Sequence, residues 1–277
     1  MIIYFLYILL ALTSIYLILI MPKIINRPDI TKFMGRLYAH RGLHQGKSIP
    51  ENSLAAFKLA VENNYGIELD VQLSMDGVPV VFHDDNLKRV CGIDRKVKDL
   101  NFDELRELTL YDSKEKIPHF QEVLDLVDGK VPLIVEIKSS NASDREALSC
   151  NTIAPYLDKY NGVYCVESFN PIVVLWYKNN RPSVVRGQLA TKSINKKPTF
   201  KNRLLNFTLR NLLFNFLAKP DFIAYNHKNS SLVSYNLCRT LYKPLTVAYT
   251  IQSQEDLEKN EDKFDLFIFD NFIPLEK

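Results

Sequence analysis

The amino-acid sequence predicts a parallel α/β protein, a (β/α)8 TIM barrel, with one transmembrane helix in front of it. Two observations predict the barrel. From Leu37 onward, short apolar runs alternate with longer amphipathic runs seven or eight times, which is typical of parallel strands joined by crossover helices. This region is about 240 residues long, a length that suits a (β/α)8 barrel. A doubly wound parallel sheet shows the same alternation and stays open as the alternative.

An uncharged segment at the N-terminus predicts the transmembrane helix. The twenty residues from Ile2 to Met21 include no charged side chain. As a helix that rises about 1.5 Å per residue, they span about 30 Å, the thickness of a bilayer's hydrocarbon core. A cleaved signal peptide is the alternative, but the segment has neither a basic start nor a clear small-residue cleavage site after it. We therefore expect residues 1–22 to be a retained anchor.

The charges next to this anchor predict which side of the membrane holds the barrel. Only the α-amino group precedes the apolar run, whereas residues 23–36 carry four basic side chains. By the positive-inside rule, this segment and the chain after it lie in the cytoplasm. We expect a single-pass membrane protein in which 23–36 is a juxtamembrane linker and 37–277 is the barrel domain.

Nine apolar runs after the linker are expected to be strands. This is one more than a simple barrel has, so one of them is expected to be a rim strand or no strand at all. Amphipathic runs between most of them are expected to be helices. The expected strands are 37–41, 66–73, 78–83, 131–137, 163–168, 184–189, 221–225, 245–250 and 265–270. The expected helices are 52–64, 102–110, 119–128, 144–160, 170–179, 230–242 and 253–262.

Charge and cysteine content exclude some classes of function. The net charge of +3 on 277 residues is too small to indicate nucleic-acid binding. The cysteines, Cys91, Cys150, Cys165 and Cys238, form no CxxC pair and no zinc-binding spacing. We therefore expect free thiols, as in a reducing compartment.

Polar side chains lie at the carboxyl ends of the first five expected strands. In a (β/α)8 barrel these ends meet at one mouth, where the active site forms. Side chains alternate along a strand, so Glu68 and Asp70 share one face, as do Glu136 and Lys138. We expect both pairs to point into the mouth. The polar residues at these ends are His40, Arg41, Glu68, Asp70, His83, Glu136, Lys138 and Ser168.

The acids and histidines in this set suggest a metal and acid–base chemistry. Carboxylates such as Glu68, Asp70 and Glu136 suit a hard cation, Ca²⁺ or Mg²⁺, and would repel one another strongly without one. Zinc is less expected because no Cys or His cluster has its spacing. His40 and His83 can exchange protons near neutral pH.

The basic residues extend this chemistry to a phosphate. Arg41 and Lys138 are cations of the kind that bind phosphate oxygens. A metal, two histidines and two cations together suggest cleavage of a phosphodiester, with one histidine activating the nucleophile and the other protonating the leaving alkoxide. Ser168 is not expected to be a nucleophile because no triad-like set accompanies it. His44 and His227 are expected to be solvated.

Six signatures, HRG, PEN[TS], ExDV, HD, ExK and SFxP, occur in an order that resembles the glycerophosphodiester phosphodiesterase family. Each signature alone is weak, but six in one order make a chance match very improbable. The resemblance covers roughly residues 37–275 and is looser after 190. The matching segments are "AHRG" (39–42), "PENSLAAF" (50–57), "IELDVQLSMDGVPVVFHDDNLKR" (67–89), "VEIK" (135–138) and "ESFNP" (167–171).

The resemblance implies a (β/α)8 barrel of the PLC-like phosphodiesterase type. Such a barrel hydrolyses glycerophosphodiesters to glycerol 3-phosphate and an alcohol with a divalent cation, Ca²⁺ or Mg²⁺. The resemblance also implies roles for single residues: His40 and His83 as the acid–base pair, Glu68, Asp70 and Glu136 as metal ligands, Arg41 and Lys138 as phosphate contacts, and Glu51 as support for the metal or the first loop.

The chain departs from the family's usual pattern at three places. Tyr249 stands in "VAYTIQ" where most members have Trp, and is expected to offer an aromatic wall to the substrate. His119 stands where Thr is common and is expected to be a surface loop residue. The last strand lacks the usual Gly and Thr but keeps an acid, Asp270. None of these positions is expected to touch the histidine–carboxylate set.

A basic segment late in the chain has two interpretations. Residues 192–219 contain seven Lys or Arg residues and no acid, and polar residues recur near every fourth position from Asn202. We expect an amphipathic helix over 202–219. It is either an ordinary barrel helix that covers the sheet or a face that lies on an anionic bilayer.

The sequence leaves the substrate and two rival functions open. The substrate is either a deacylated phospholipid or a lysophospholipid. A rival enzyme would be another phosphodiester cleaver on the same barrel that releases a cyclic phosphate, as phosphoinositide- or sphingomyelin-type enzymes do. A rival of another class would be a catalytically silent, membrane-bound binding barrel.

Overall fold

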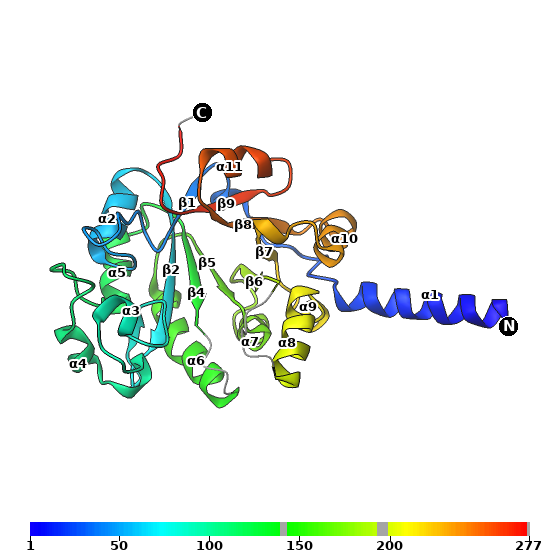
Figure 1. Ribbon diagram of the computed structural model, residues 1–277, viewed down its shortest axis with the longest axis horizontal. Helices are drawn as coiled ribbons and strands as arrows, with labels where there is room; N and C mark the ends of the chain where they lie inside the picture. The colour runs from blue at the N-terminus through cyan, green and yellow to red at the C-terminus, as the bar shows by residue number, and fades with distance from the viewer. Residues whose placement is uncertain (139–142, 193–198, 276–277) are drawn as a thin grey trace.

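The computed structural model describes residues 1–138, 143–192 and 199–275, and in them the chain forms a closed barrel of eight parallel strands (Figure 1). The strands follow the order β1-β9-β8-β7-β6-β5-β4-β2, and pairing of β1 with β2 closes the ring. Closure excludes the doubly wound sheet, which is open, and confirms the predicted barrel. The strands are β1 (Leu37–His40), β2 (Gly66–Leu73), β4 (Leu133–Ile137), β5 (Tyr164–Ser168), β6 (Arg186–Ala190), β7 (Phe222–Asn226), β8 (Leu245–Ile251) and β9 (Leu266–Phe269).

The ninth expected strand is a rim strand. β3 (Pro79–Val81) pairs antiparallel with the end of β2, with Val71 opposite Val81, and takes no part in the closed ring. It packs on a separate apolar cluster together with α3 (Lys88–Cys91), the 3₁₀ turn η2 (Val97–Asp99) and α4 (Phe102–Glu107). This small subdomain between β2 and β4 places His83 beside the barrel mouth.

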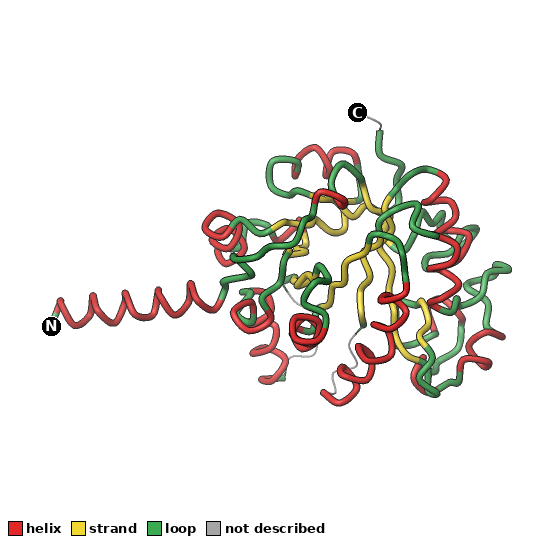
Figure 2. Tube along the Cα trace, turned by 180° about the vertical axis from the view of Figure 1, so that it is seen from behind, coloured by secondary structure: helices red, strands yellow, loops and turns green. Residues whose placement is uncertain are grey.

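Helices surround the barrel on the outside (Figure 2). All seven expected helices are present, with ends that shift by a few residues. Two short 3₁₀ turns, η1 (Thr31–Phe33) and η3 (His227–Asn229), lie before β1 and after β7. The covering helices are α2 (Leu54–Glu62), α5 (Phe120–Val127), α6 (Ser143–Lys159), α7 (Pro171–Asn180), α8 (Phe200–Arg210), α9 (Asn215–Ala218), α10 (Val233–Tyr242) and α11 (Gln254–Asn260).

The prediction of one helix over 202–219 is wrong. α8 ends at Arg210, Leu212 adopts a left-handed backbone with φ of 58°, and a separate short helix, α9, follows. Leu212 is fully buried in the main core. Burial of this leucine offsets the cost of its left-handed conformation, about 1–2 kcal/mol, and forces the chain to turn there. Residues 193–198 of the basic segment lie outside the described residues.

Apolar side chains fill the part of the barrel interior that lies away from the mouth. Tyr38, Ile134 and Phe222 belong to this buried cluster. Two glycines make room for the rings, because a Cβ on Gly187 would lie 2.0 Å from Phe222 and one on Gly66 would lie 2.5 Å from Tyr38. The polar residues at the carboxyl ends of the strands therefore border a packed apolar core, which excludes water from the other end of the barrel.

The N-terminal helix α1 (Ile2–Leu19) extends away from the barrel, and none of its side chains is buried (Figure 1). Among the described residues it is the one helix long and apolar enough to cross a membrane. The residue after it behaves differently, because Ile20 is fully buried in the main core. The base of the helix is therefore part of the barrel's packing.

Replacing Ile20 with alanine is expected to destabilise the barrel. Loss of a fully buried isoleucine leaves a cavity and lowers the free energy of unfolding by about 2–5 kcal/mol. Ile15→Ala is the matched control, since Ile15 is exposed on α1. Thermal unfolding of the full chain in detergent measures both. Equal melting temperatures for the two variants would contradict the assignment of Ile20 to the core.

Candidate active site

The turn after β1 shapes one wall of the mouth. Arg41 and Gly42 both have left-handed backbone, with φ of 57° and 80°. This sharp turn directs the Arg41 backbone N–H to Glu68, where it donates to Oε2 at 3.0 Å. A Cβ on Gly42 would lie 2.9 Å from the backbone of Ala56 in α2. Only glycine therefore fits this position.

Gly42→Ala is expected to cost more stability than a matched glycine replacement. Both Gly42 and Gly77 have positive φ, but nothing lies within 4 Å of a Cβ on Gly77. Gly77→Ala therefore measures the backbone strain alone, about 1 kcal/mol, whereas Gly42→Ala adds a steric clash of about 1–3 kcal/mol. Urea unfolding of the two variants checks this. Equal losses would show that the contact with Ala56 is readily relieved.

Three carboxylates converge inside the mouth, as the alternation of side chains predicted. Glu68 and Asp70 come from β2 and Glu136 comes from β4, and Asp70 is paired in register with Glu136. All three are buried, and one oxygen of each lies within 4.8 Å of the others. The structure thus confirms that these residues share one small volume.

Positive groups offset part of this negative charge. Lys138 Nζ lies 2.9 Å from Glu136 and 3.3 Å from Asp70, and Arg41 Nε lies 3.4 Å from Asp70. Asn52 also donates to Asp70 at 2.8 Å. Burial alone would raise the pKa of Asp70, but Lys138 and the other nearby cations outweigh it and hold that pKa far below its usual range.

The two glutamates are not fully compensated. Burial and the charge of Asp70 raise the pKa of Glu68 well above its usual value, and burial also raises the pKa of Glu136. Asp70 Oδ1 has only the ion pair with Lys138 and accepts no hydrogen bond. A buried set of carboxylate oxygens with spare acceptor capacity and excess negative charge fits a hard divalent cation.

His40 lies next to this cluster. Its Nε2 lies 3.9 Å from Glu68 Oε2, and its Nδ1 lies 3.2 Å from Asp270 Oδ2. Burial lowers the pKa of His40, although Asp270 opposes this shift. The ring therefore presents one nitrogen to the cluster while a carboxylate holds the other.

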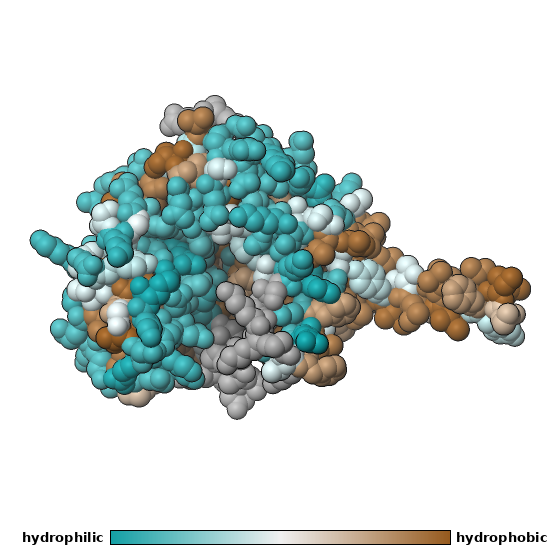
Figure 3. Space-filling model, in the orientation of Figure 1, coloured by the Kyte–Doolittle hydropathy of each residue, from teal (hydrophilic) through white to brown (hydrophobic). Residues whose placement is uncertain are grey.

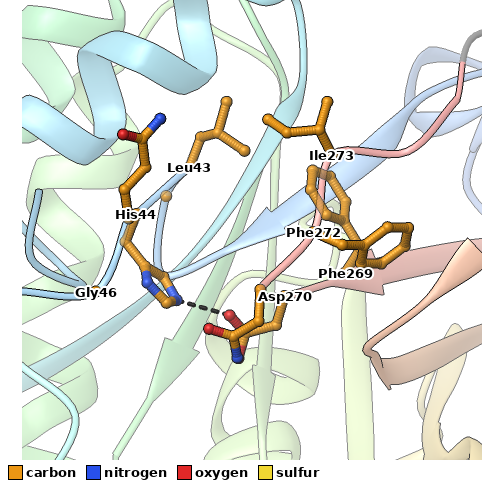
Figure 4. A pocket seen from close by; sticks show the side chains of 10 residues that line it. Leu43, His44, Gly46, Phe269, Asp270, Phe272 and Ile273 are labelled. Atoms are coloured by element: carbon orange, nitrogen blue, oxygen red, sulfur yellow. Dashed lines mark ion pairs between the residues drawn. The ribbon is translucent and has the colours of Figure 1, made fainter.

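Asp270 binds a second histidine as well. Its Oδ1 lies 2.7 Å from His44 Nε2 (Figure 4). Because its Oδ2 contacts His40, this carboxylate links the two histidines. The two histidines outweigh burial and hold the pKa of Asp270 well below its usual range. Two expectations are therefore wrong. Asp270 contacts His40, one of the two candidate catalytic histidines, and His44 is a partly buried ion-pair partner rather than a solvated side chain. A cavity of about 300 Å³ adjoins this pair and is lined partly by Leu43 and Phe272.

His83 has its own carboxylate partner on the opposite, β3 side. Its Nδ1 lies 2.6 Å from Asp84, which also accepts from Arg89 Nε at 2.7 Å. Together with Lys138, a positive charge on His83 helps to lower the pKa of Asp70, and it opposes the burial that raises the pKa of Glu136, so His83 lies within electrostatic range of the cluster. Each candidate histidine thus has one nitrogen fixed by an aspartate.

A network of ion pairs ties the two histidine-bearing loops together. Glu51 accepts from Arg41 at 2.6 Å and from Arg89 at 2.7 Å. These arginines outweigh burial and lower the pKa of Glu51 to about 2. Glu51 therefore supports the first loop, one of the two roles that the resemblance implied.

Three more expectations can be compared with the structure. The hydroxyl of Tyr249 donates to the Ala190 carbonyl at 2.7 Å, and its ring lies edge-on to Phe169. Its role toward a substrate stays a prediction. Ser168 is fully buried and donates to Ile137, which agrees with its exclusion as a nucleophile. His119 caps α5, because its Nδ1 accepts from the Gln121 backbone N–H, so its role is structural.

Two further polar side chains, His227 and Glu167, are buried. His227 is buried rather than solvated. Glu167 lies beside Glu136 in register, and burial raises the pKa of its carboxyl group well above the usual value. The sequence contains a signal for Glu167. It stands two residues before Phe169, and side chains two residues apart share one face of a strand, here the inward face of β5.

Comparisons with known proteins point to one family. A model of the "Glycerophosphoryl diester phosphodiesterase family" matches residues 40–229. A glycerophosphodiester phosphodiesterase from Caldanaerobacter subterraneus subsp. tengcongensis is 43% identical over 109 residues, which cover 36% of this chain and 44% of that protein. A lysophospholipase D from Mus musculus is 35% identical over 136 residues, which cover 43% of this chain and 39% of that protein. The matched segments thus span less than half of these curated relatives.

A solved structure extends the similarity of fold over most of the chain. It is a phosphodiesterase from Oleispira antarctica in complex with the product sn-glycerol-3-phosphate. The two folds superpose with a TM-score of 0.69 at 22% sequence identity, and the match covers 86% of this chain and 94% of the other.

Proposed function

This chain belongs to the glycerophosphoryl diester phosphodiesterase family, and on that premise we propose that it hydrolyses glycerophosphodiesters to glycerol 3-phosphate and an alcohol. One observation carries the proposal. Two histidines, each held by an aspartate at one nitrogen, flank a buried cluster of three carboxylates that also contains a lysine and an arginine. Similar proteins bear the same activity in their names, and one similar fold holds glycerol 3-phosphate.

Glu68, Asp70 and Glu136 would hold the divalent cation, either Ca²⁺ or Mg²⁺. Bound there, the cation would withdraw charge from the phosphate oxygens and make the phosphorus easier to attack. Arg41 and Lys138 lie within the same cluster and supply further positive charge for the phosphate.

The two histidines divide the proton transfers. Burial lowers the pKa of His40, which favours the neutral ring, so the nitrogen on the side of the carboxylate cluster is suited to accept a proton from the attacking water. His83 then protonates the leaving alkoxide, and Asp84 stabilises its charged form. Tyr249 and Phe169 provide an aromatic wall beside this centre.

A substrate panel tests the proposal and identifies the substrate class. The full chain, purified in detergent with Mg²⁺ or Ca²⁺, is given glycerophosphoethanolamine, glycerophosphoglycerol or a lysophospholipid, and the released alcohol is quantified. Cleavage of deacylated diesters would place the chain with glycerophosphodiester phosphodiesterases. Cleavage of lysolipid alone would favour the activity named for the mouse relative. No cleavage of any of them by folded protein would favour a binding barrel.

Asp270 is expected to be a positioning residue for His40. Asp270→Asn keeps the shape but removes the charge that orients the ring, so we expect kcat to fall about 10- to 100-fold with KM nearly unchanged. His44→Gln, which alters only the far side of Asp270, is expected to have a smaller effect. Steady-state kinetics on the best substrate measures both. A change in KM alone would assign Asp270 to substrate binding.

The N-terminal helix is proposed to anchor the enzyme to the membrane. Residues 1–22 would span the bilayer once, 23–36 would follow as a linker, and the domain 37–277 would face the cytoplasm, in line with the length and apolar character of α1. A C-terminal fusion to green fluorescent protein tests the topology in bacteria, because this reporter matures only in the cytoplasm. Fluorescent membranes are expected. A fully expressed fusion that does not fluoresce would show that the domain lies on the opposite side of the membrane.

A further inference from the structure

The base of α1 is fixed to the barrel by several contacts. Tyr16 donates to Ser234 at 2.9 Å, and the Leu17 carbonyl accepts from Tyr242 at 2.9 Å. The Ile20 carbonyl accepts from the buried Asn215 side chain at 3.0 Å. A helix held at three successive points cannot swivel freely on its barrel.

The segment just after α1 adds further contacts to the same side. Lys23 pairs with the buried Asp221 at 3.1 Å, and its backbone N–H donates to the Pro220 carbonyl. Arg27 donates to the Lys243 carbonyl at 2.6 Å, at the end of α10. The direction of α1 is therefore set relative to α9 and α10, and a membrane around α1 would meet these helices first.

The helices beside this base expose apolar side chains. Six side chains on α8, α9 and α10 are between 39% and 68% exposed. Figure 3 shows the apolar surface of α1 continuing onto the adjoining part of the barrel, where Figure 1 places these helices. Contiguous apolar surface next to a membrane span is typical of membrane contact. The six are Leu204, Phe207, Phe216, Leu217, Val233 and Leu241.

The charge on this side suits the surface of an anionic bilayer. Residues 199–219 include four basic side chains and no acid. Arg203 is exposed on α8, and the Arg210 guanidinium lies 5.3 Å from the ring centre of the exposed Phe207. Apolar side chains bordered by arginine match the boundary between acyl chains and anionic headgroups, where each basic residue contributes about 1 kcal/mol.

We propose that this α8–α10 face lies in the headgroup region of the bilayer that α1 crosses. The barrel would then keep one fixed orientation, with α8, α9 and α10 toward the membrane. The partner is a lipid bilayer with anionic lipid. Continuity with α1 carries this choice, since a partner protein would have to share the same face with the membrane. The inference rests on the proposed anchor and adds that the anchor is no free tether.

Single-tryptophan fluorescence in nanodiscs with brominated acyl chains tests the contact. All variants of the full chain carry Trp176→Phe, which removes the native tryptophan. Phe207→Trp and Phe216→Trp report on the α8–α10 face. Met75→Trp and Leu148→Trp are matched controls, because both positions are about half exposed but lie on the β2–β3 turn and α6. Tyr7→Trp reports on α1 itself.

The expected result is strong quenching at positions 7, 207 and 216 and little at 75 and 148. Quenching at position 7 alone, with 207 and 216 no more quenched than the controls, would overturn the contact and leave the anchor standing. Absence of quenching at position 7 would overturn the anchor and the contact together. Because the reporters lie on exposed side chains of separate helices, one unfolded variant would not decide the outcome.

Discussion

Replacing His40 or His83 with alanine is expected to lower the rate of diester cleavage by about 100- to 10,000-fold, the range typical of a lost general acid or base. In the structure an aspartate holds one nitrogen of each ring, Asp270 for His40 and Asp84 for His83, and the other nitrogen of His40 lies 3.9 Å from Glu68. kcat measured on the best substrate of the panel checks the expectation.

Two further variants make this test specific. The double variant is expected to lose little more than the worse single variant, because the two histidines act in one reaction. His119→Ala removes only a helix cap, which costs about 1 kcal/mol of stability, and should leave kcat in place. Activity within threefold of the native protein in either His40→Ala or His83→Ala would remove that histidine from the chemistry.

Removal of the cation is expected to have an effect of similar size. Chelation with EDTA should abolish activity, and added Mg²⁺ or Ca²⁺ should restore it. Glu136→Gln should lower kcat about 1,000-fold, which corresponds to about 4 kcal/mol of transition-state stabilisation. The reason is that Glu136 supplies one of three oxygens that converge in the buried cluster.

Glu167 offers a matched control for this replacement. It lies beside Glu136 on the neighbouring strand but is not one of the three carboxylates that converge, and burial raises the pKa of its carboxyl group well above the usual value, which favours the neutral form. Glutamine resembles a neutral glutamic acid, so Glu167→Gln should retain activity within about tenfold of the native protein. Activity unaffected by EDTA, or equal losses in the two variants, would contradict the assignment of the cation to Glu68, Asp70 and Glu136.

Most of the fold followed from local patterns. The alternation of apolar and amphipathic runs has a simple physical cause, since parallel strands need crossover helices and the barrel closes after eight of them. The convergence of Glu68, Asp70 and Glu136 followed from the two-residue period of strands. The same reasoning predicted β3 as a strand but did not show whether it joins the ring, because that depends on which strands pair with it.

The missed features depend on contacts between distant parts of the chain. The link of His40 to Asp270 joins the first and last strands, which become neighbours only on closure. The break at Leu212 arises because the core draws that side chain inward against the local helical pattern. Likewise, an apolar run predicts a membrane span, but the docking of its base depends on α9 and α10.

The origin and form of the product test the central proposal most directly. Native protein, His83→Ala and an EDTA-treated sample are incubated with glycerophosphoethanolamine in ¹⁸O-water, and the phosphorus products are identified by ³¹P NMR and mass spectrometry. The account predicts cation-dependent glycerol 3-phosphate that carries one ¹⁸O atom and is nearly absent in the variant. A cyclic glycerophosphate as the sole end product, without ¹⁸O, would contradict it and place the chain among the cyclising phosphodiester cleavers.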